Sequence, residues 1–304
     1  MARLRWQKRV GPMVWALLLL VGLIPVQLHA MGGPTAAEYG VVLNLSGKQR
    51  MLTQKMSKEV MLIALDVDKA ANLTNLKGTA ALFDKTLKGL RDGDADLKLP
   101  PTNTKRIRRQ LGKVEKIWGS FQPVIDAILA SGSVSKEQID LISAQNLPLL
   151  KQMNKGVKLY EKDASKAGMK ADPGLAVTIN LSGKQRMLTQ KMSKEFLLAA
   201  YGHDTENNKL NLLETYSLFE RTLKGLLDGD STLDLPGTKS ETIRTQLGVV
   251  NGLWTSFKPI VAFGADPATS SIPMDKIQTL AKTNLPLLKQ MNKAVKMYEK
   301  EAAK

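Results

Sequence analysis

Two arginines in identical surroundings are the residues of this sequence best suited to hold a charged ligand. Arg50 and Arg186 each stand within the segment NLSGKQRMLTQKMSKE, which begins at Asn44 and returns letter for letter from Asn180. A guanidinium group offers a planar fork of hydrogen-bond donors that matches a planar or tetrahedral oxyanion. These residue types therefore indicate capture of a small anion.

The neighbours of Arg50 form a narrow polar stripe. On a helical wheel, Ser46, Thr53 and Ser57 share one face with this arginine, whereas Leu52 lies on an apolar face. Small side chains let a second helix approach closely, and a helical glycine, which costs about 1 kcal/mol, often marks such an approach. The predicted ligand-binding residues are therefore Arg50, Gly47, Ser46 and Thr53, with Arg186, Gly183, Ser182 and Thr189 in the second copy.

If the two stripes face each other, the two arginines converge. Buried guanidinium groups repel one another, so such a pair is tolerated mainly when an anion lies between them. The alternative is a purely structural contact between helices. The segment matches at 16 of 16 positions, whereas 60–81 and 196–217 share only 7 of 22, so the segment is the more constrained part. Lys48, Lys55 and Lys58 are expected on an ordinary solvated face.

The repeat divides the chain into two units, 36–165 and 172–304. LFDKTLKGLRDGD from Leu82 is answered by LFERTLKGLLDGD from Leu218, 136 positions later. NLPLLKQMNK from Asn146 returns intact from Asn284, 138 positions later, so a two-residue insertion lies between the two, which we place around 265–271. The short segment that joins the units contains glycine and proline, which punctuate helices.

Each unit must supply the helices that position its arginine. Apolar residues recur every three or four positions in four stretches of the first unit, at 35–69, 73–92, 103–130 and 135–162. Four helices with short connections favour an up-down bundle. We therefore predict an all-α protein of two tandem four-helix bundles. Trp118, Phe121, Trp254 and Phe257 have core spacing.

The first thirty residues read as an export signal. Four basic residues between Arg3 and Arg9 precede an apolar run, and Leu28-His29-Ala30 resembles a cleavage site. We expect cleavage after Ala30 and a periplasmic protein, since the apolar run is too short for a span. Beyond Ala30 no apolar run is long enough to cross a bilayer.

Composition excludes several classes of function. The formal net charge is +16, and +12 without the four basic residues of the signal, which attracts anions in general. Nucleic acid is not expected as a partner, because aromatic residues are few and the basic residues alternate with acidic ones. Without cysteine there is no thiol chemistry. No catalytic or cofactor motif is present. A repeated metal site is not expected either, because His203 has a valine as its counterpart in the first repeat and Asp92-Gly93-Asp94 reads as a turn.

The repeated segment resembles the signature of the PilJ-type domain, found at the N-terminus of type IV pili methyl-accepting chemotaxis transducers, and of the related NarX-like nitrate/nitrite sensor domain. The family pattern N-x-x-G-x-x-R-M with a following Ser/Thr and Gln is matched by Asn44, Gly47, Arg50, Met51, Thr53 and Gln54, and by Asn180, Gly183, Arg186, Met187, Thr189 and Gln190. The resemblance implies a periplasmic four-helix bundle that dimerises. In the NarX-like family it also implies that one arginine from each subunit grips a nitrate across the symmetry axis.

The sequence thus predicts a non-catalytic periplasmic sensory or binding protein. It would hold a small oxyanion, nitrate or nitrite first, between the first helices of its two repeats and report to a separate membrane receptor or envelope partner. The alternative is a structural or protein-interaction module of the cell envelope or of a type IV pilus or chemosensory system, without a small ligand. Pairing of the repeats within one chain and pairing in a homodimer are both compatible with the sequence.

Overall fold

The computed structural model describes residues 33–166, 169 and 172–304, and eight long helices account for most of them. The predicted export signal at 1–30 lies outside the described residues. The first repeat forms α1 (Ala36–Ala64), α2 (Lys69–Asp92), α3 (Lys105–Ser131) and α4 (Lys136–Lys166). The second forms α5 (Pro173–Tyr201), α6 (Thr205–Asp228), the single-turn η1 (Ser231–Leu233), α7 (Glu241–Ala265) and α8 (Met274–Glu301). No described helix is long and apolar enough to span a membrane.

The all-α prediction is confirmed, with one boundary corrected. The helix predicted at 35–69 already ends at Ala64, and α2 begins at Lys69 rather than near 73. Asp66 and Asp68 cause the break, because their backbones adopt the left-handed conformation, with φ of 55° and 42°. Aspartate tolerates this conformation better than most residues, since its short side chain hydrogen-bonds locally.

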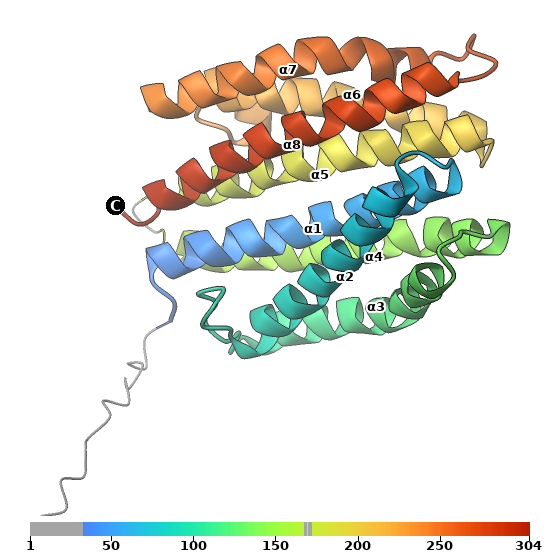
Figure 1. Ribbon diagram of the computed structural model, residues 1–304. Coiled ribbons are helices and arrows are strands. Elements are labelled where there is room, and N and C mark those ends of the chain that lie inside the picture. Colours follow the sequence, from blue (N-terminus) through green and yellow to red (C-terminus); the bar gives the residue numbers. More distant parts are fainter. Residues whose placement is uncertain (1–32, 167–168, 170–171) are drawn as a thin grey trace, which may run out of the picture. The chain divides into compact units, whose positions relative to one another are not determined.

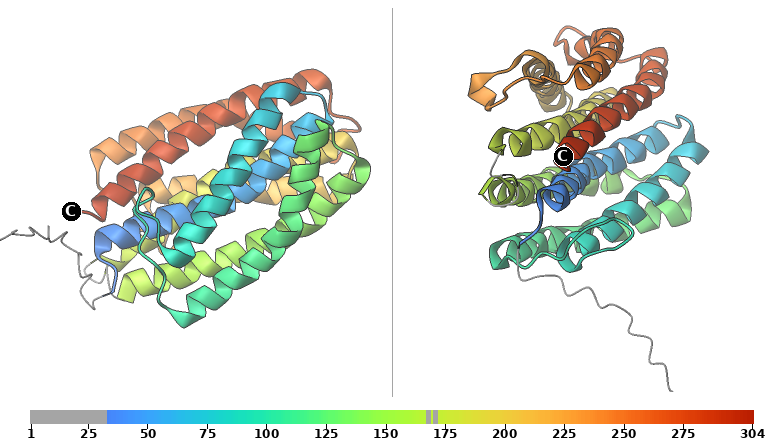
Figure 2. Two further views of the ribbon diagram at one scale, coloured as in Figure 1. Left: turned by 60° about the horizontal axis from the view of Figure 1, so that its bottom comes forward. Right: turned by 90° about the vertical axis from the view of Figure 1, so that its left-hand side faces the viewer.

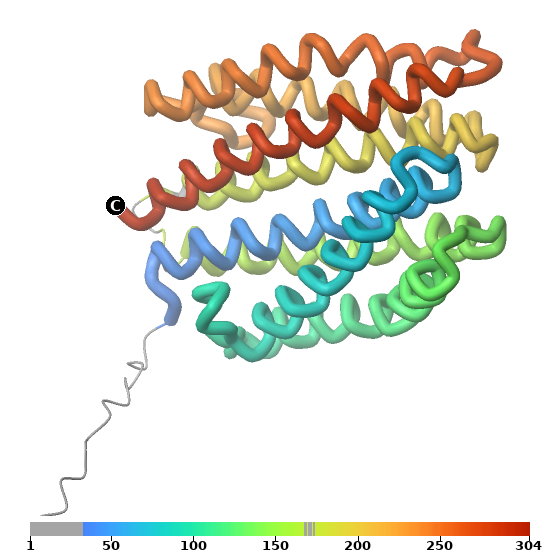
Figure 3. The backbone as a smooth tube through the Cα atoms, viewed as in Figure 1, coloured from blue at the N-terminus to red at the C-terminus, as the bar shows by residue number. Residues whose placement is uncertain are grey.

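The two repeats lie side by side along their first helices (Figure 1). α1 makes a more extensive contact with α5 than either makes with any other helix, and α4 and α8 also cross to the opposite repeat. Figure 2 shows the two sets of four helices from two further directions, and in Figure 3 α1 and α5 run in the same direction. Residues 33–304 therefore form one compact unit. The division of the chain into two domains, 36–165 and 172–304, stays a prediction.

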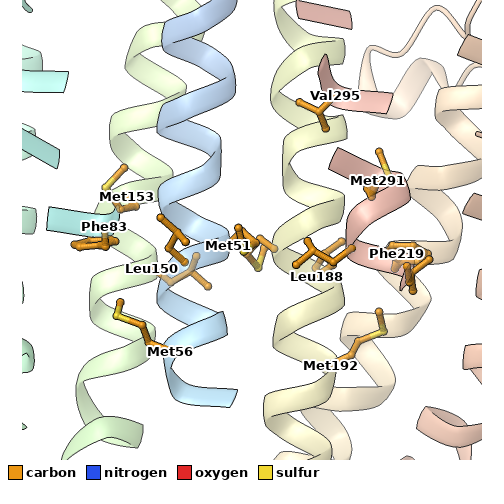
Figure 4. Close-up of a cluster of buried hydrophobic side chains, with 14 of the residues drawn as sticks. Met51, Met56, Phe83, Leu150, Met153, Leu188, Met192, Phe219, Met291 and Val295 are labelled. Atoms are coloured by element: carbon orange, nitrogen blue, oxygen red, sulfur yellow. The ribbon is translucent and has the colours of Figure 1, made fainter. Parts of the chain in front are cut away.

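Buried apolar side chains pack around the two central helices. Met51 lies between α1 and α5, while Phe83 with Met153 and Phe219 with Met291 lie on the outer sides (Figure 4). The predicted core position of the tryptophans is confirmed: Trp118 and Trp254 are 4% and 3% exposed, each with its ring centroid 4.6 Å from that of a phenylalanine. These cores hold α1 and α5 in fixed register with the outer helices.

One pair of positions is packed differently in the two repeats. The second repeat combines Phe196, which is fully buried, with Gly264, where the first repeat has Val60 and Ile128. A Cβ atom on Gly264 would lie 2.3 Å from Cδ2 of Phe196, so the glycine makes room for the ring. The larger residue on one helix is thus matched by the smaller one on its neighbour.

We expect Gly264→Ala to lower the free energy of unfolding by about 1–3 kcal/mol, because the added methyl overpacks the core against Phe196. Phe196→Val in the same chain should recover part of this loss. Gly252→Ala, also on α7 but with nothing within 4 Å of its Cβ position, is the matched control and should stabilise slightly. Urea unfolding of the variants measures both effects. An unchanged free energy of unfolding in Gly264→Ala would contradict the tight packing of this glycine against Phe196.

Candidate functional site

α1 and α5 lie close together where the two glycines of the repeated segment meet. A Cβ atom on Gly47 would lie 3.9 Å from Cα of Gly183, and the reciprocal distance is also 3.9 Å. The same Cβ on Gly47 would lie 3.3 Å from Nη2 of Arg50 and 3.5 Å from Nη2 of Arg186. We call this place the glycine crossing. Both guanidinium groups therefore lie over it, one from each repeat.

Each arginine is held by backbone and amide oxygens from both repeats. Arg50 donates through Nη2 to the carbonyl oxygen of Asn180 (2.9 Å) and through Nη1 to Oδ1 of Asn154 (3.2 Å). Arg186 donates through Nη2 to the carbonyl oxygen of Asn44 (2.9 Å) and through Nη1 to its Oδ1 (2.7 Å). Asn292 Oδ1 accepts a further bond from Nη1 of Arg186 (3.2 Å). Neutral groups thus orient both guanidinium planes.

The two charges at the glycine crossing are buried without a direct counter-ion. Arg50 and Arg186 are each 2% exposed, and among the described residues no carboxylate lies within 4 Å of either guanidinium. The nearest acids act at one remove: Glu161 accepts from the side chain of Asn180, and Glu299 from that of Asn44. Positive charge therefore exceeds negative charge at the centre of the crossing.

Burial lowers the pKa of both arginines. It lowers the pKa of Arg50 to about 10, against the opposing effect of Glu161. Burial and then the charge of Arg50 lower the pKa of Arg186 to about 9, with Glu299 acting the other way. The Nε atoms of both arginines are buried and have no hydrogen-bond partner in the described part of the chain. An anion at this place would relieve the repulsion between the two guanidinium groups and could accept hydrogen bonds from these Nε atoms.

The hydroxyl groups of the predicted site are buried beside the arginines but bond within their own helices. Thr53 donates to the carbonyl oxygen of Arg50 and Thr189 to that of Arg186, both at 2.8 Å. The Ser46 and Ser182 hydroxyls donate to the carbonyl oxygens three residues earlier, at 3.3 and 3.1 Å. Their hydroxyl protons are therefore not available to a ligand in this arrangement, and their role in binding stays a prediction.

The sequence pattern missed the asparagines that orient the arginines. Asn154 and Asn292 lie in the repeated NLPLLKQMNK segment of α4 and α8, and Asn44 and Asn180 open the repeated segment of α1 and α5. The exact repetition of both segments was a signal that they meet. Asn44 and Asn180 also match the first position of the family pattern, whereas Asn154 and Asn292 had no further pointer, since asparagine is common at turns and helix ends.

A second polar layer lies further along the same helices. Lys58 donates from Nζ to Oδ1 of Asn284 on α8 (3.0 Å), and Lys194 donates to Oδ1 of Asn146 on α4 (3.2 Å). We call these two contacts the lysine clasps. They cross from one repeat to the other, and both lysines are buried, at 3% and 5% exposure.

The prediction that three lysines of α1 form a solvated face is therefore wrong. Lys58 is buried, Lys55 pairs with the buried Glu59 and bonds Thr79, and Lys48 is only partly exposed. The reason is the position of α1, which contacts α2, α4, α5 and α8 and so has neighbours all around. A helical wheel read for a single bundle leaves one face to solvent, whereas here the second repeat covers that face.

Comparison with known proteins identifies related domains in both repeats. The family model for the type IV pili methyl-accepting chemotaxis transducer N-terminal domain (PilJ) matches residues 37–142 and 170–296. The chain is also similar to the methyl-accepting chemotaxis protein McpN of Pseudomonas aeruginosa, with 30% identity over 124 residues, 40% of this chain. The match spans 22% of the length of McpN, so the chain covers about a fifth of this relative. Each family match contains one of the two arginines.

Proposed function

Because the chain belongs to the family of type IV pili methyl-accepting chemotaxis transducer N-terminal domains, we propose that it is a non-catalytic sensory protein that holds one small oxyanion between Arg50 and Arg186. Nitrate and nitrite are the first candidates, since their planar shape suits neighbouring guanidinium forks. The two first helices of one chain supply both arginines. One chain is then sufficient for the site.

The observation that carries this proposal is the uncompensated charge at the glycine crossing. Two guanidinium groups are buried there without a carboxylate within 4 Å among the described residues, and each keeps a buried Nε without a partner. Leaving buried charges unpaired is expensive, and a bound anion offsets this cost. The neutral asparagines orient the guanidinium groups without cancelling their charge, as an anion site requires.

We further propose that the protein acts in the periplasm and reports to a separate membrane partner. The predicted signal at 1–30 supports export, and McpN, to which the chain is similar, is by name a methyl-accepting chemotaxis protein. The partner would recognise the state of the bundle rather than the anion itself, because the arginines are buried. A structural role in the envelope, without a small ligand, is the competing reading.

The proposal is tested by thermal unfolding of the protein in nitrate, nitrite, sulfate and chloride at matched ionic strength. An anion at about 100 times its dissociation constant should stabilise the native state by about 2.7 kcal/mol. Arg50→Gln and Arg186→Gln should each remove most of this response, because the anion needs both forks. Arg109→Gln, at an exposed position of α3, is the control for loss of one positive charge.

Two outcomes would contradict the proposal. If all four anions shift the unfolding temperature equally, the effect is general screening. If one anion stabilises the protein selectively but still does so in both arginine variants, the binding site of that anion lies elsewhere. In either case the arginines are interhelical contacts, and the search turns to a protein partner.

A further inference from the structure

One face of α4 forms a basic groove at the surface. The groove has a volume of about 360 Å³ and is lined by Leu147, Leu150, Lys151, Asn154, Lys155 and Lys158. Counted from Leu147, the others lie 3, 4, 7, 8 and 11 residues further on, so all six share one side of the helix. The lysines are exposed, and the lining contains no acidic residue. The groove therefore offers three ammonium groups above an apolar wall.

The groove reaches the buried arginine through a single side chain. Asn154 belongs to the lining and also accepts the hydrogen bond from Nη1 of Arg50, at 3.2 Å. This asparagine is partly exposed, whereas the arginine is 2% exposed. Asn154 thus contacts both the surface groove and an arginine of the glycine crossing. A rotation of the Asn154 side chain would free a guanidinium donor toward the groove.

Positive charge continues from the groove to the crossing. Lys184 on α5 is partly buried, and its pKa is lowered first by burial and then by the charges of Arg50 and Lys158. This lysine therefore lies within the field of both the groove and the crossing. Within the described residues, none of the three groove lysines forms an ion pair. Their charges are free to act on a ligand.

We propose that the groove on α4 is an outer anion-binding site from which a small oxyanion passes, by way of Asn154, to Arg50. This inference rests on the proposed function for its second step but not for its first. A groove lined by charges of one sign over an apolar wall raises the local concentration of counter-charged ligand, by about tenfold to a thousandfold, and salt weakens the effect. The lysines collect the anion, and the crossing holds it.

The outer site can be tested by the reactivity of a single introduced thiol, since the chain has no cysteine of its own. Leu147→Cys places the thiol at the groove, where the leucine is 48% exposed. Its rates with anionic sulfonatoethyl and cationic trimethylammonioethyl methanethiosulfonate are compared at low salt. Leu213→Cys on α6, at a leucine that is 42% exposed, is the matched control. Using the ratio of the two rates cancels differences in thiol ionisation.

We expect the anionic-to-cationic ratio at Leu147→Cys to exceed that at Leu213→Cys by about tenfold, and to fall when salt is raised. Lys151→Gln, Lys155→Gln and Lys158→Gln together should remove the excess, and nitrate should slow the anionic reagent selectively. Equal ratios at the two thiols, or a ratio that survives loss of the three lysines, would overturn the outer site.

The link to Arg50 is tested by nitrate affinity. The triple groove variant should bind nitrate several-fold more weakly at low salt than a control that loses three exposed lysines of α3 (Lys105→Gln, Lys113→Gln and Lys116→Gln). Equal affinity in the two variants would overturn the passage to the crossing. If the unaltered protein binds no oxyanion at all, the proposed function fails, while the thiol ratio still decides whether the groove collects anions.

Discussion

Replacing both crossing arginines with methionine is expected to make the anion-free protein more stable and at the same time insensitive to oxyanions. Arg50 and Arg186 are buried, and no carboxylate of the described residues pairs with either. Each charge loses its hydration on burial, which destabilises the folded protein. Exchange of buried ionic groups for apolar residues of similar volume commonly stabilises by about 1–4 kcal/mol. Arg50→Met with Arg186→Met should therefore raise the free energy of unfolding in urea by an amount in this range.

The single variants sharpen this prediction. Arg50→Met removes the charge that lowers the pKa of Arg186. The remaining arginine is then free of this repulsion but is still buried. Each single variant should gain more than half of the double, because the first substitution already removes the whole repulsion together with one of the two buried charges. A double variant less stable than the unaltered protein would show that the asparagine contacts outweigh the buried charge, which would remove the main argument for an anion.

Stability should rise with pH above about 8, because of the lysine clasps. Burial lowers the pKa of both Lys58 and Lys194 to about 8, from 10.5, with Glu59 and Glu195 opposing. Between pH 8 and pH 10.5 the unfolded chain therefore holds more protons than the folded chain, so the free energy of unfolding increases with pH. Below about pH 8 both lysines are charged in either state, and the cost of burying the charge is fully present.

The expected rise is on the order of a few kcal/mol for the two lysines, since one pKa unit corresponds to about 1.4 kcal/mol. It is measured by urea unfolding from about pH 7 to pH 9.5. Above pH 10 the tyrosines act in the opposite direction, because burial raises the pKa of Tyr160 and Tyr298 to about 12. Arg186 and Arg50 add to the rise in the upper part of the range.

Two variants of the clasps separate charge from hydrogen bonding. Lys58→Met should raise stability at pH 7 and reduce the slope, since Oδ1 of Asn284 still accepts from Gln190 at 2.8 Å. Lys194→Met should reduce the slope equally but gain less, because Oδ1 of Asn146 then loses its bond to this lysine. Lys113→Met at an exposed site should leave the slope unchanged. An unchanged slope in both clasp variants would refute the assignment.

The fold could be predicted because helical periodicity is a local property. Three- and four-residue spacing of apolar side chains marked the helices, and the exact repeat showed that they form two similar sets. The boundary near Asp68 was missed because the sequence pattern continues through it, while the backbone turns into the left-handed conformation. Aspartate tolerates this conformation without requiring it, so residue type alone does not mark such a turn.

The site was predicted only in its symmetric part. Arg50 and Arg186 could be placed together because identical helices that pack on each other bring identical residues together. The partners of the arginines could not, since Asn154 lies 104 positions from Arg50 and its orientation depends on how α4 is placed. Lys58 was assigned to solvent because a wheel cannot show that a second bundle covers the outer face.

The pairing of α1 with α5 inside one chain changes how a response depends on protein concentration. Where two halves of a site come from separate subunits, dilution separates them and the signal fades. Here a short covalent connection between α4 and α5 keeps the halves at a high effective concentration, so pairing is intramolecular. The pairing of the two halves therefore does not depend on how many copies of the protein a cell holds.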